Sequence, residues 1–217
     1  MSKRIRRCFA SSIALFCSWA GARLASAEMQ DPQPELVVGI HNYAGVPHAT
    51  LTHGQEQATE VFGRIGIKLR WVDCPPSNEE TEKFRACGQV MGSGGVFLKI
   101  LPERMATRLG LPDQKFGVAV PPRAAFVFYQ RIENLAKGRG LLESAILGPV
   151  MAHELGHLLL GKGSHSADGI MNEVMLREAF RGAEKGVFPL FTTEQAQRMR
   201  AGLLERMKAP QQRGQLP

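Results

Sequence analysis

The residues with the clearest chemical meaning are His153, Glu154 and His157, which form a His-Glu-x-x-His motif. On a helix, positions i and i+4 lie on one face about one turn apart, so both imidazoles can bind one metal ion. Glu154 lies about 100° around the helix, where its carboxylate reaches a metal-bound water rather than the metal. Zinc lowers the pKa of such a water towards ~7, so the carboxylate can take its proton during attack on a carbonyl. The motif therefore predicts a zinc hydrolase with Glu154 as the general base.

A catalytic zinc usually has three protein ligands and one open position, so a third ligand has to come from elsewhere in the chain. His165 lies eight residues after the motif and is the last histidine of the sequence. Gly161 and Gly163 precede it and allow the chain to leave the helix and turn back. We therefore predict His165 as the third ligand. A carboxylate on the next expected helix, Glu173 or Glu178, is the alternative, because a His₂Glu set also binds zinc.

Residues 153–165, followed by Gly-Ile-Met at 169–171, resemble the metzincin class of zinc peptidases. Those enzymes share the pattern His-Glu-x-x-His-x-x-Gly-x-x-His and a methionine in a tight turn below the metal. This chain differs, because Gly161 lies one position later and His165 two positions later than the pattern requires. The longer spacing looks like that of a bacterial metzincin-like group. The resemblance implies a zincin-like fold, in which a twisted mixed sheet packs on the motif helix, and hydrolysis of peptide bonds with zinc.

The resemblance also implies roles for residues outside the motif. Met171 is expected to form the turn below the histidines as a packing residue, and residues 116–120 to form an edge strand that binds an extended peptide. Some metzincins use a tyrosine after that turn, but Tyr43 and Tyr129 both precede the motif, so this role has no candidate. Asp168 is expected to form the turn after the helix, and the orientation of a ligand histidine by its carboxylate is the alternative.

Residues 1–27 have the pattern of a cleaved secretory signal: a basic start, an apolar stretch and Ala-Ser-Ala at the end. The apolar stretch is shorter than the ~20 residues that span a bilayer, so we expect no membrane anchor. We predict cleavage after Ala27 and export to the periplasm or the exterior. Five of the 27 basic residues and none of the 20 acidic ones lie in this segment, so the remaining chain is nearly neutral. Its charge therefore predicts no nucleic-acid partner.

The predicted cleavage removes Cys8 and Cys17 and leaves Cys74 and Cys87. An even pair in an exported chain predicts a disulfide, which would stabilise the fold by about 3 kcal/mol by restricting the unfolded chain. Two unpaired thiols are the alternative. Neither cysteine lies in a C-x-x-C motif, so a cysteine-based metal site is not expected. The remaining histidines are predicted to have structural or surface roles, because most histidines are not ligands: His41, His48 and His53.

Apolar periodicity predicts the elements that position these residues. Strands are predicted at residues 36–40, 67–72, 96–101, 116–120 and 125–129. Helices are predicted at residues 50–65, 102–109, 174–181 and 194–207, with Thr193 as the cap of the last one. The motif helix is predicted to end at Leu160, before Gly161.

The start of the motif helix is open, because Pro149 suits either a kink in a helix that begins near Ser144 or the first turn of a new helix. Residues 73–95 contain Cys, Pro, Asn and Gly and are predicted as a loop fixed by the disulfide. The order of elements predicts one mixed α/β domain at residues 28–208, with a sheet behind the motif helix. Residues 209–217 are predicted to be a flexible tail.

Two other functions are compatible with the same residues. The zinc site could hydrolyse non-peptide amides or esters, because neither fold nor motif determines the substrate. The chain could also be a non-catalytic zinc-binding protein, although a purely structural site does not need Glu154. The leading prediction is a zinc metalloendopeptidase with a peptide or protein substrate, and a monomer is the default oligomeric state.

Overall fold

The computed structural model describes residues 33–75, 82–172 and 189–208, all of which belong to one compact unit, Pro32–Pro217. The predicted signal, the predicted helix at residues 174–181 and the predicted tail lie outside the described residues. The predicted domain limits therefore stay a prediction. None of the described helices is both long and apolar enough to cross a bilayer.

Five strands form one sheet in the order β2-β1-β3-β5-β4. They are β1 (Glu35–Asn42), β2 (Lys68–Cys74), β3 (Val96–Leu101), β4 (Gly117–Val120) and β5 (Ala124–Phe128). β4 is an edge strand and runs antiparallel to β5, whereas the other neighbours pair in parallel. All five predicted strands are confirmed; β3 has the predicted ends, and the ends of the others differ by at most two residues.

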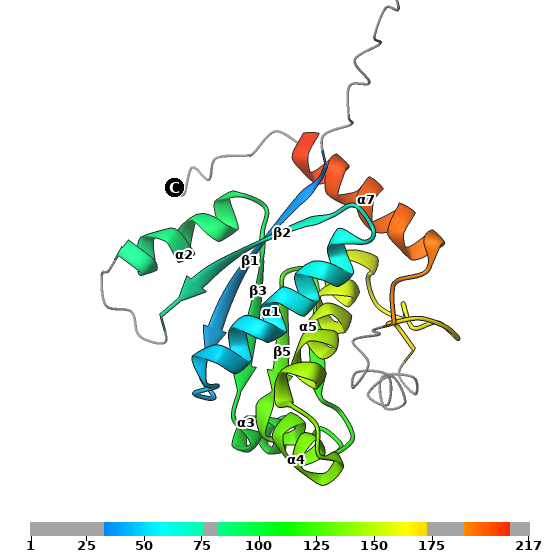
Figure 1. Ribbon diagram of the computed structural model, residues 1–217. Coiled ribbons are helices and arrows are strands. Elements are labelled where there is room, and N and C mark those ends of the chain that lie inside the picture. The colour runs from blue at the N-terminus through cyan, green and yellow to red at the C-terminus, as the bar shows by residue number, and fades with distance from the viewer. Residues whose placement is uncertain (1–32, 76–81, 173–188, 209–217) are drawn as a thin grey trace, which may run out of the picture. The chain divides into compact units, whose positions relative to one another are not determined.

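Helices cover both faces of the sheet (Figure 1). On one face α1 (His48–Gly63) and the motif helix α5 (Glu143–Leu160) lie side by side, and Leu36, Val38 and Ile40 of β1 join their core. On the other face α2 (Glu82–Gly92) packs against β1, β2 and β3. The sheet therefore lies behind the motif helix, and the predicted mixed α/β class is confirmed.

Two glycines allow α1 and α5 to approach closely. A Cβ atom on Gly148 would lie 2.9 Å from the carbonyl oxygen of Gly54, and a Cβ on Gly54 would lie 3.1 Å from Leu147. Larger side chains at these positions would push the helices apart. The close contact fixes the motif helix relative to the sheet.

The motif helix begins at Glu143 and continues through Pro149 to Leu160, so the first of the two predicted starts is confirmed. It ends where expected, because Gly161 adopts φ 89° and its N–H donates to the His157 carbonyl. Gly163, with φ 70°, also has the left-handed conformation that glycine favours. Both glycines therefore turn the chain back towards the helix.

The prediction that residues 73–95 are mainly loop is wrong, because α2 occupies much of this segment. Cys87 and Val90 are buried, and their spacing of three residues places both on the helix face that meets the sheet. The predicted disulfide is confirmed, with Cys74 bonded to Cys87. The bridge therefore connects the end of β2 to a helix and not to a loop.

Helix α4 (Tyr129–Arg139) was not predicted. Its buried side chains are those of Tyr129, Arg131, Ile132 and Ala136. An arginine at a core position hides the apolar periodicity, because arginine usually lies at the surface. Arg131 is only 6% exposed because its guanidinium has protein partners that replace water.

The short helix α3 (Glu103–Arg108) and the last helix α7 (Thr193–Lys208) confirm the predictions at residues 102–109 and 194–207. The predicted cap Thr193 is wrong by one residue. The Thr192 Oγ1 accepts from the Gln195 N–H at 3.3 Å, and the Gln195 side chain accepts from the Thr192 N–H at 3.0 Å. This reciprocal pair is a capping box, so α7 starts one residue earlier than expected.

Candidate metal centre

Three histidine rings converge at the C-terminal half of α5. The Nε2 atom of His157 lies 3.0 Å from Nε2 of His153 and 3.0 Å from Nε2 of His165. A tetrahedral zinc ion with Zn–N bonds of ~2.0–2.1 Å holds its nitrogen ligands about 3.3–3.4 Å apart. The three nitrogens are therefore close to the spacing that one shared ion requires, and they form a candidate metal site.

Backbone and hydroxyl groups hold two of these rings in place. The Nδ1 atom of His153 lies 2.8 Å from the carbonyl oxygen of Ile170, and Nδ1 of His157 lies 2.8 Å from the Ser164 hydroxyl. A carbonyl oxygen only accepts, so Nδ1 of His153 carries the hydrogen and Nε2 carries the lone pair. Such contacts on the outer ring nitrogen orient metal-binding histidines.

The tautomers make the group suitable for a cation. In the neutral His153 ring the Nε2 lone pair points at His157, and the Ser164 hydroxyl can accept from His157 to give it the same tautomer. Lone pairs that face each other at 3.0 Å repel, and a cation between them turns that repulsion into coordination. Imidazole nitrogens suit Zn²⁺ among the divalent metals. The donor set therefore fits zinc.

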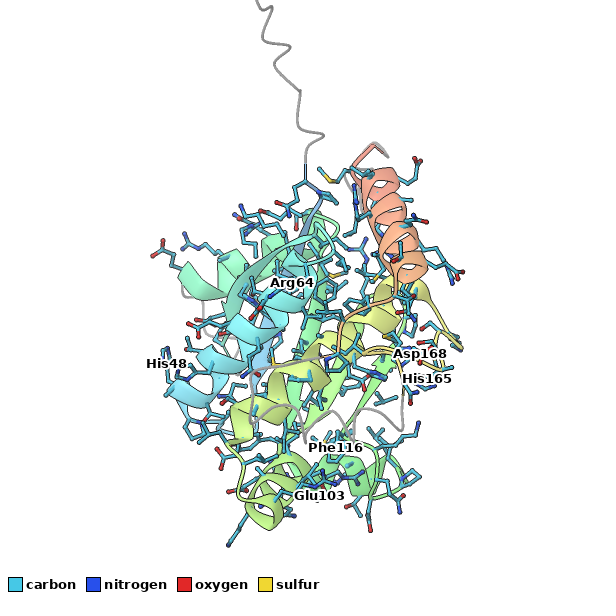
Figure 2. The ribbon with its side chains drawn as sticks, turned by 45° about the vertical axis from the view of Figure 1, so that its right-hand side comes forward. His48, Arg64, Glu103, Phe116, His165 and Asp168 are labelled. Atoms are coloured by element: carbon cyan, nitrogen blue, oxygen red, sulfur yellow. A yellow bond between two sulfur atoms is a disulfide. The ribbon has the colours of Figure 1, made fainter. Side chains whose placement is uncertain are left out.

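The third ring comes from the loop after α5, as predicted. Figure 2 shows His165 and Asp168 on this loop and Phe116 on the chain that leads into β4. The carbonyl of Asp168 accepts from the Ser166 hydroxyl at 2.7 Å, which favours its role as a turn residue. The competing ligands Glu173 and Glu178 lie outside the described residues. The structure thus brings the three predicted histidines together, and their role as zinc ligands stays a prediction.

A cleft opens beside the histidines, between α5 and the edge strand β4. Its wall is formed by the chain before and within β4, the motif residues and the loop after α5. The lining residues include Phe116, Gly117, Val118, His153, Glu154 and His165. The predicted base Glu154 is 5% exposed and lies in this wall next to the ligands.

Gly117 makes room for Glu154. A Cβ atom at Gly117 would lie 2.6 Å from Oε1 and 2.7 Å from Cγ of Glu154. The carboxylate therefore packs directly on the backbone of β4, which fixes its position beside the histidines. The sequence pattern places Gly117 only in an edge strand and indicates no role for it at the site.

The chain before β4 is held by Arg131 of α4. Its guanidinium donates to the Lys115 carbonyl at 2.7 Å and to the Glu103 carboxylate at 2.8–3.0 Å. It also donates to the carbonyl of Pro112. One buried side chain thus anchors the segment that forms the outer wall of the cleft.

Met171 packs against the motif helix at Gly156, and the carbonyl of its neighbour Ile170 contacts His153. It is completely buried, and a Cβ atom on Gly156 would lie 2.7 Å from its sulfur and 2.8 Å from the Phe191 ring. The turn is closed by the Asn172 N–H, which donates to the carbonyl of Gly169 at 3.1 Å. Met171 therefore packs against α5 at Gly156, in agreement with the packing role expected for it.

We expect Gly156→Ala to destabilise the protein by about 1–3 kcal/mol, because the new methyl group would overlap Met171 and Phe191. Alanine otherwise stabilises helices by up to ~1 kcal/mol over glycine. Gly202→Ala in α7 is the matched control, because a Cβ there meets no atom within 4 Å. Urea unfolding of both variants measures the difference, and equal stabilities would contradict the close packing of Met171 and Phe191 on Gly156.

The remaining predicted residues lie away from the cleft. His48 and His53 are exposed on α1, as predicted. His41 is half-buried beside the disulfide, and burial lowers its pKa because it disfavours the charged ring. Tyr129 donates to the Glu143 carboxylate at 3.2 Å, and burial together with that charge raises its pKa to about 12. Neither Tyr129 nor Tyr43 lines the cleft.

No protein-family model matches the chain, and no curated protein matches it. Among solved structures the chain is similar to an archaemetzincin from Methanopyrus kandleri, with 15% sequence identity and a TM-score of 0.47. The match covers 81% of this chain and 99% of that chain. A likeness of this extent assigns the chain to no family.

Proposed function

We propose that this protein is an exported zinc-dependent peptidase in which His153, His157 and His165 hold the metal and Glu154 is the general base. The observation that carries the proposal is the convergence of three Nε2 atoms beside the buried Glu154 carboxylate, in the wall of an accessible cleft. A buried carboxylate next to three imidazoles is the arrangement that zinc hydrolases need.

Each residue of the site has a separate role in the proposed reaction. When bound, zinc supplies Lewis acidity that polarises a substrate carbonyl and makes an attacking water more acidic. Glu154 accepts the proton of that water at a carboxylate oxygen and later donates it to the leaving amine nitrogen. Gly117 holds the carboxylate against β4, and the Ile170 carbonyl keeps the His153 lone pair directed at the metal position.

The edge strand β4 favours a peptide substrate over a small amide or ester. In the described part of the chain, β4 pairs only with β5, so its outer side offers backbone N–H and C=O groups. Gly117, Val118 and Ala119 of β4 line the cleft beside the histidines. An extended peptide can add to such an edge through main-chain hydrogen bonds. The substrate backbone would then lie next to Glu154.

Export is supported by the disulfide. Cys74 is bonded to Cys87, and disulfides form and persist in oxidising compartments and are rare in cytosolic proteins. It agrees with the secretory signal predicted at residues 1–27. Mass determination of the N-terminus of the protein recovered from its native compartment tests the predicted cleavage after Ala27.

The peptidase proposal is tested by incubating the purified protein with a mixed library of unstructured peptides and analysing the products by mass spectrometry. We expect cleavage that a zinc chelator removes and that added Zn²⁺, but not Mg²⁺, restores. No peptide cleavage by the zinc-loaded protein, with hydrolysis of an acylated amine, would favour the non-peptide hydrolase. Stable zinc binding without any hydrolysis would favour the non-catalytic protein.

We expect Gly117→Ala to lower kcat by up to ~100-fold while zinc content stays unchanged. The new methyl group would overlap the Glu154 carboxylate and push it away from its position, and a displacement of about 1 Å can cost a rate of this size. Gly88→Ala on the exposed side of α2 is the control, because a Cβ there meets no atom within 4 Å. Steady-state kinetics and metal analysis measure both quantities. A Gly117→Ala enzyme with unchanged kcat would show that β4 does not position the base.

A further inference from the structure

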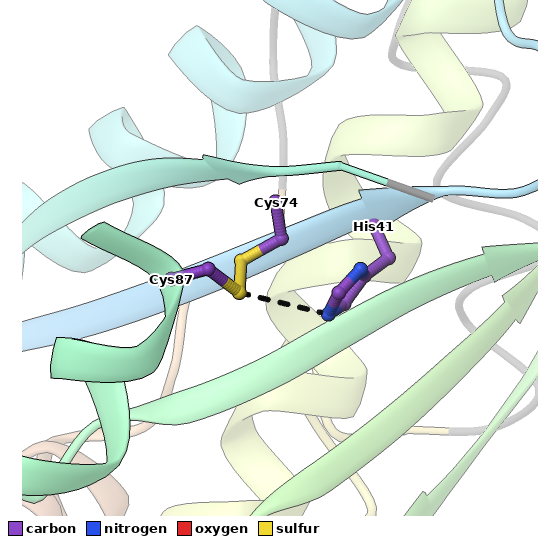
Figure 3. A group of neighbouring side chains, drawn as sticks. All are labelled: His41, Cys74 and Cys87. Carbon is purple, nitrogen blue, oxygen red and sulfur yellow. Dashed lines mark hydrogen bonds between the residues drawn. A yellow bond between two sulfur atoms is a disulfide. The ribbon is translucent and has the colours of Figure 1, made fainter. Parts of the chain in front are cut away.

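A second group of metal-binding residue types lies on the sheet face that α2 covers (Figure 3). His41 at the end of β1 pairs with Cys74 at the end of β2, and Cys87 comes from α2. The Nε2 atom of His41 lies 3.8 Å from the Sγ atom of Cys87. The ligand atoms of all three residues lie within 4.8 Å of one another.

The His41 ring is held so that Nε2 faces the sulfur. Its Nδ1 atom lies 3.2 Å from the carbonyl oxygen of Pro75 and 3.3 Å from the Tyr43 hydroxyl, and the tautomer with the hydrogen on Nδ1 donates to that carbonyl and leaves the Nε2 lone pair for a metal. Tyr43 stacks on the ring at 5.3 Å between centroids, and Phe97 contacts it at 5.7 Å. A backbone carbonyl on the outer nitrogen also orients a histidine of the catalytic cleft, and it favours metal binding through Nε2.

We propose that reduction of the Cys74–Cys87 bridge converts these two cysteines and His41 into a zinc site of the Cys₂His type. The same three residues then have two alternative states, a disulfide and a metal complex. This site does not depend on the proposed peptidase function, because it shares no residue with the cleft.

The geometry and the charge both suit zinc. Zn–S bonds of ~2.3 Å and Zn–N bonds of ~2.0 Å in a tetrahedral site place sulfur and nitrogen about 3.5 Å apart, close to the 3.8 Å between Cys87 and His41. Two thiolates and one Zn²⁺ have no net charge together. This matters because Cys74 and Cys87 are only 6% and 8% exposed, where an isolated charge is costly.

A dithiol can reduce the Cys74–Cys87 disulfide by thiol–disulfide exchange. The disulfide takes two electrons and two protons from the dithiol, which becomes a disulfide itself, and Cys74 and Cys87 become thiols. When zinc binds, each thiol loses its proton to solvent and the thiolate sulfur binds the metal, while neutral His41 binds through Nε2. The two sulfurs separate by rotation of their side chains to make room for the ion.

The absence of a C-x-x-C motif argued against a cysteine-based metal site. The fold overrides that argument, because the register between β1 and β2 places His41 opposite Cys74. Helix α2 then brings Cys87 to the same place from 13 residues further along the chain.

The site is tested with the full chain carrying His157→Ala, which removes metal binding in the cleft, together with Cys8→Ser and Cys17→Ser, which leave Cys74 and Cys87 as the cysteines of the protein. The disulfide is reduced with a phosphine, which is oxidised to a phosphine oxide with an oxygen atom from water. The products are the same two thiols, and the phosphine does not compete for the metal. Titration with Co²⁺ under anaerobic conditions should add one equivalent to the reduced protein and none to the oxidised protein. The bound Co²⁺ should show a sulfur-to-metal charge-transfer band, and Zn²⁺ should displace it.

Two variants assign the ligands. His41→Ala should weaken Co²⁺ binding at least tenfold, and the double variant Cys74→Ser/Cys87→Ser should remove the charge-transfer band, whereas His53→Ala on α1 should change neither. Near-UV circular dichroism checks that the reduced protein is folded. No added equivalent, binding unaffected by His41→Ala, or a reduced protein that unfolds and does not regain structure with zinc would overturn the proposal. The metal site of the cleft is tested separately with the oxidised chain that keeps His157. If that chain binds no Co²⁺, the proposed function fails, whereas the proposal for His41, Cys74 and Cys87 is unaffected.

Discussion

Glu154→Gln is expected to lower kcat/KM by about 100- to 10,000-fold, the range that a positioned general base contributes, while zinc content stays at the wild-type level. Glutamine has nearly the same shape, so it fits the space that Gly117 leaves on β4. The glutamine amide cannot take a proton from water. Zinc content should not change, because residue 154 is not a metal ligand in the proposed site. Peptide hydrolysis and metal analysis of the same preparation measure both properties.

The matched control is Glu56→Gln, which makes the same chemical change at an exposed position of α1 outside the cleft. It should leave kcat/KM and zinc content unchanged. A Glu154→Gln enzyme that keeps more than about a tenth of the activity would show that another group takes the proton. A variant that loses both zinc and activity would instead show that Glu154 supports the metal site.

The sequence predicted the parts of the molecule that depend on local patterns. The apolar runs of the five strands, the spacing of α1 and the glycine at the end of the motif helix all follow from periods of two or 3.6 residues and from Gly161. The positions of His153, Glu154 and His157 on one turn follow from the same helix. A helix places those side chains regardless of what packs around it.

The missed helices show where local patterns fail. In α4 a buried Arg131 occupies a core position because Glu103 and the backbone before β4 satisfy its guanidinium. In α2 a cysteine that suggested a loop instead belongs to the apolar face of a helix. In both cases the tertiary partner decides the environment, and that partner lies far away in the sequence.

The contacts that orient the site could not be predicted for the same reason. The carbonyl of Ile170 and the backbone of Gly117 carry no side-chain signal, yet they hold His153 and Glu154. Ser164 lies close to His165 in the sequence and could have been proposed as a partner of a ligand histidine. Only Asp168 was considered for that role, as the alternative to a turn residue, because carboxylates are common partners of metal-binding histidines.

His165→Ala decides the composition of the metal centre, and we expect it to weaken zinc binding by more than the ~100-fold that loss of an orienting partner can cost. The structure supports this result, because Nε2 of His165 lies 3.0 Å from Nε2 of His157. Competition with a chelator of known affinity measures the dissociation constant. His53→Ala is the control, because it removes an exposed imidazole from α1.

The carboxylate alternative predicts the opposite pattern. If Glu173 or Glu178 were the third ligand, Glu173→Gln or Glu178→Gln would weaken zinc binding and His165→Ala would leave it nearly unchanged. The loop makes the histidine the stronger candidate: Gly161 and Gly163, both with positive φ, turn the chain back within four residues of the helix end and bring His165 to the motif. The two extra residues relative to the metzincin pattern therefore lengthen the loop without removing its third imidazole from the site.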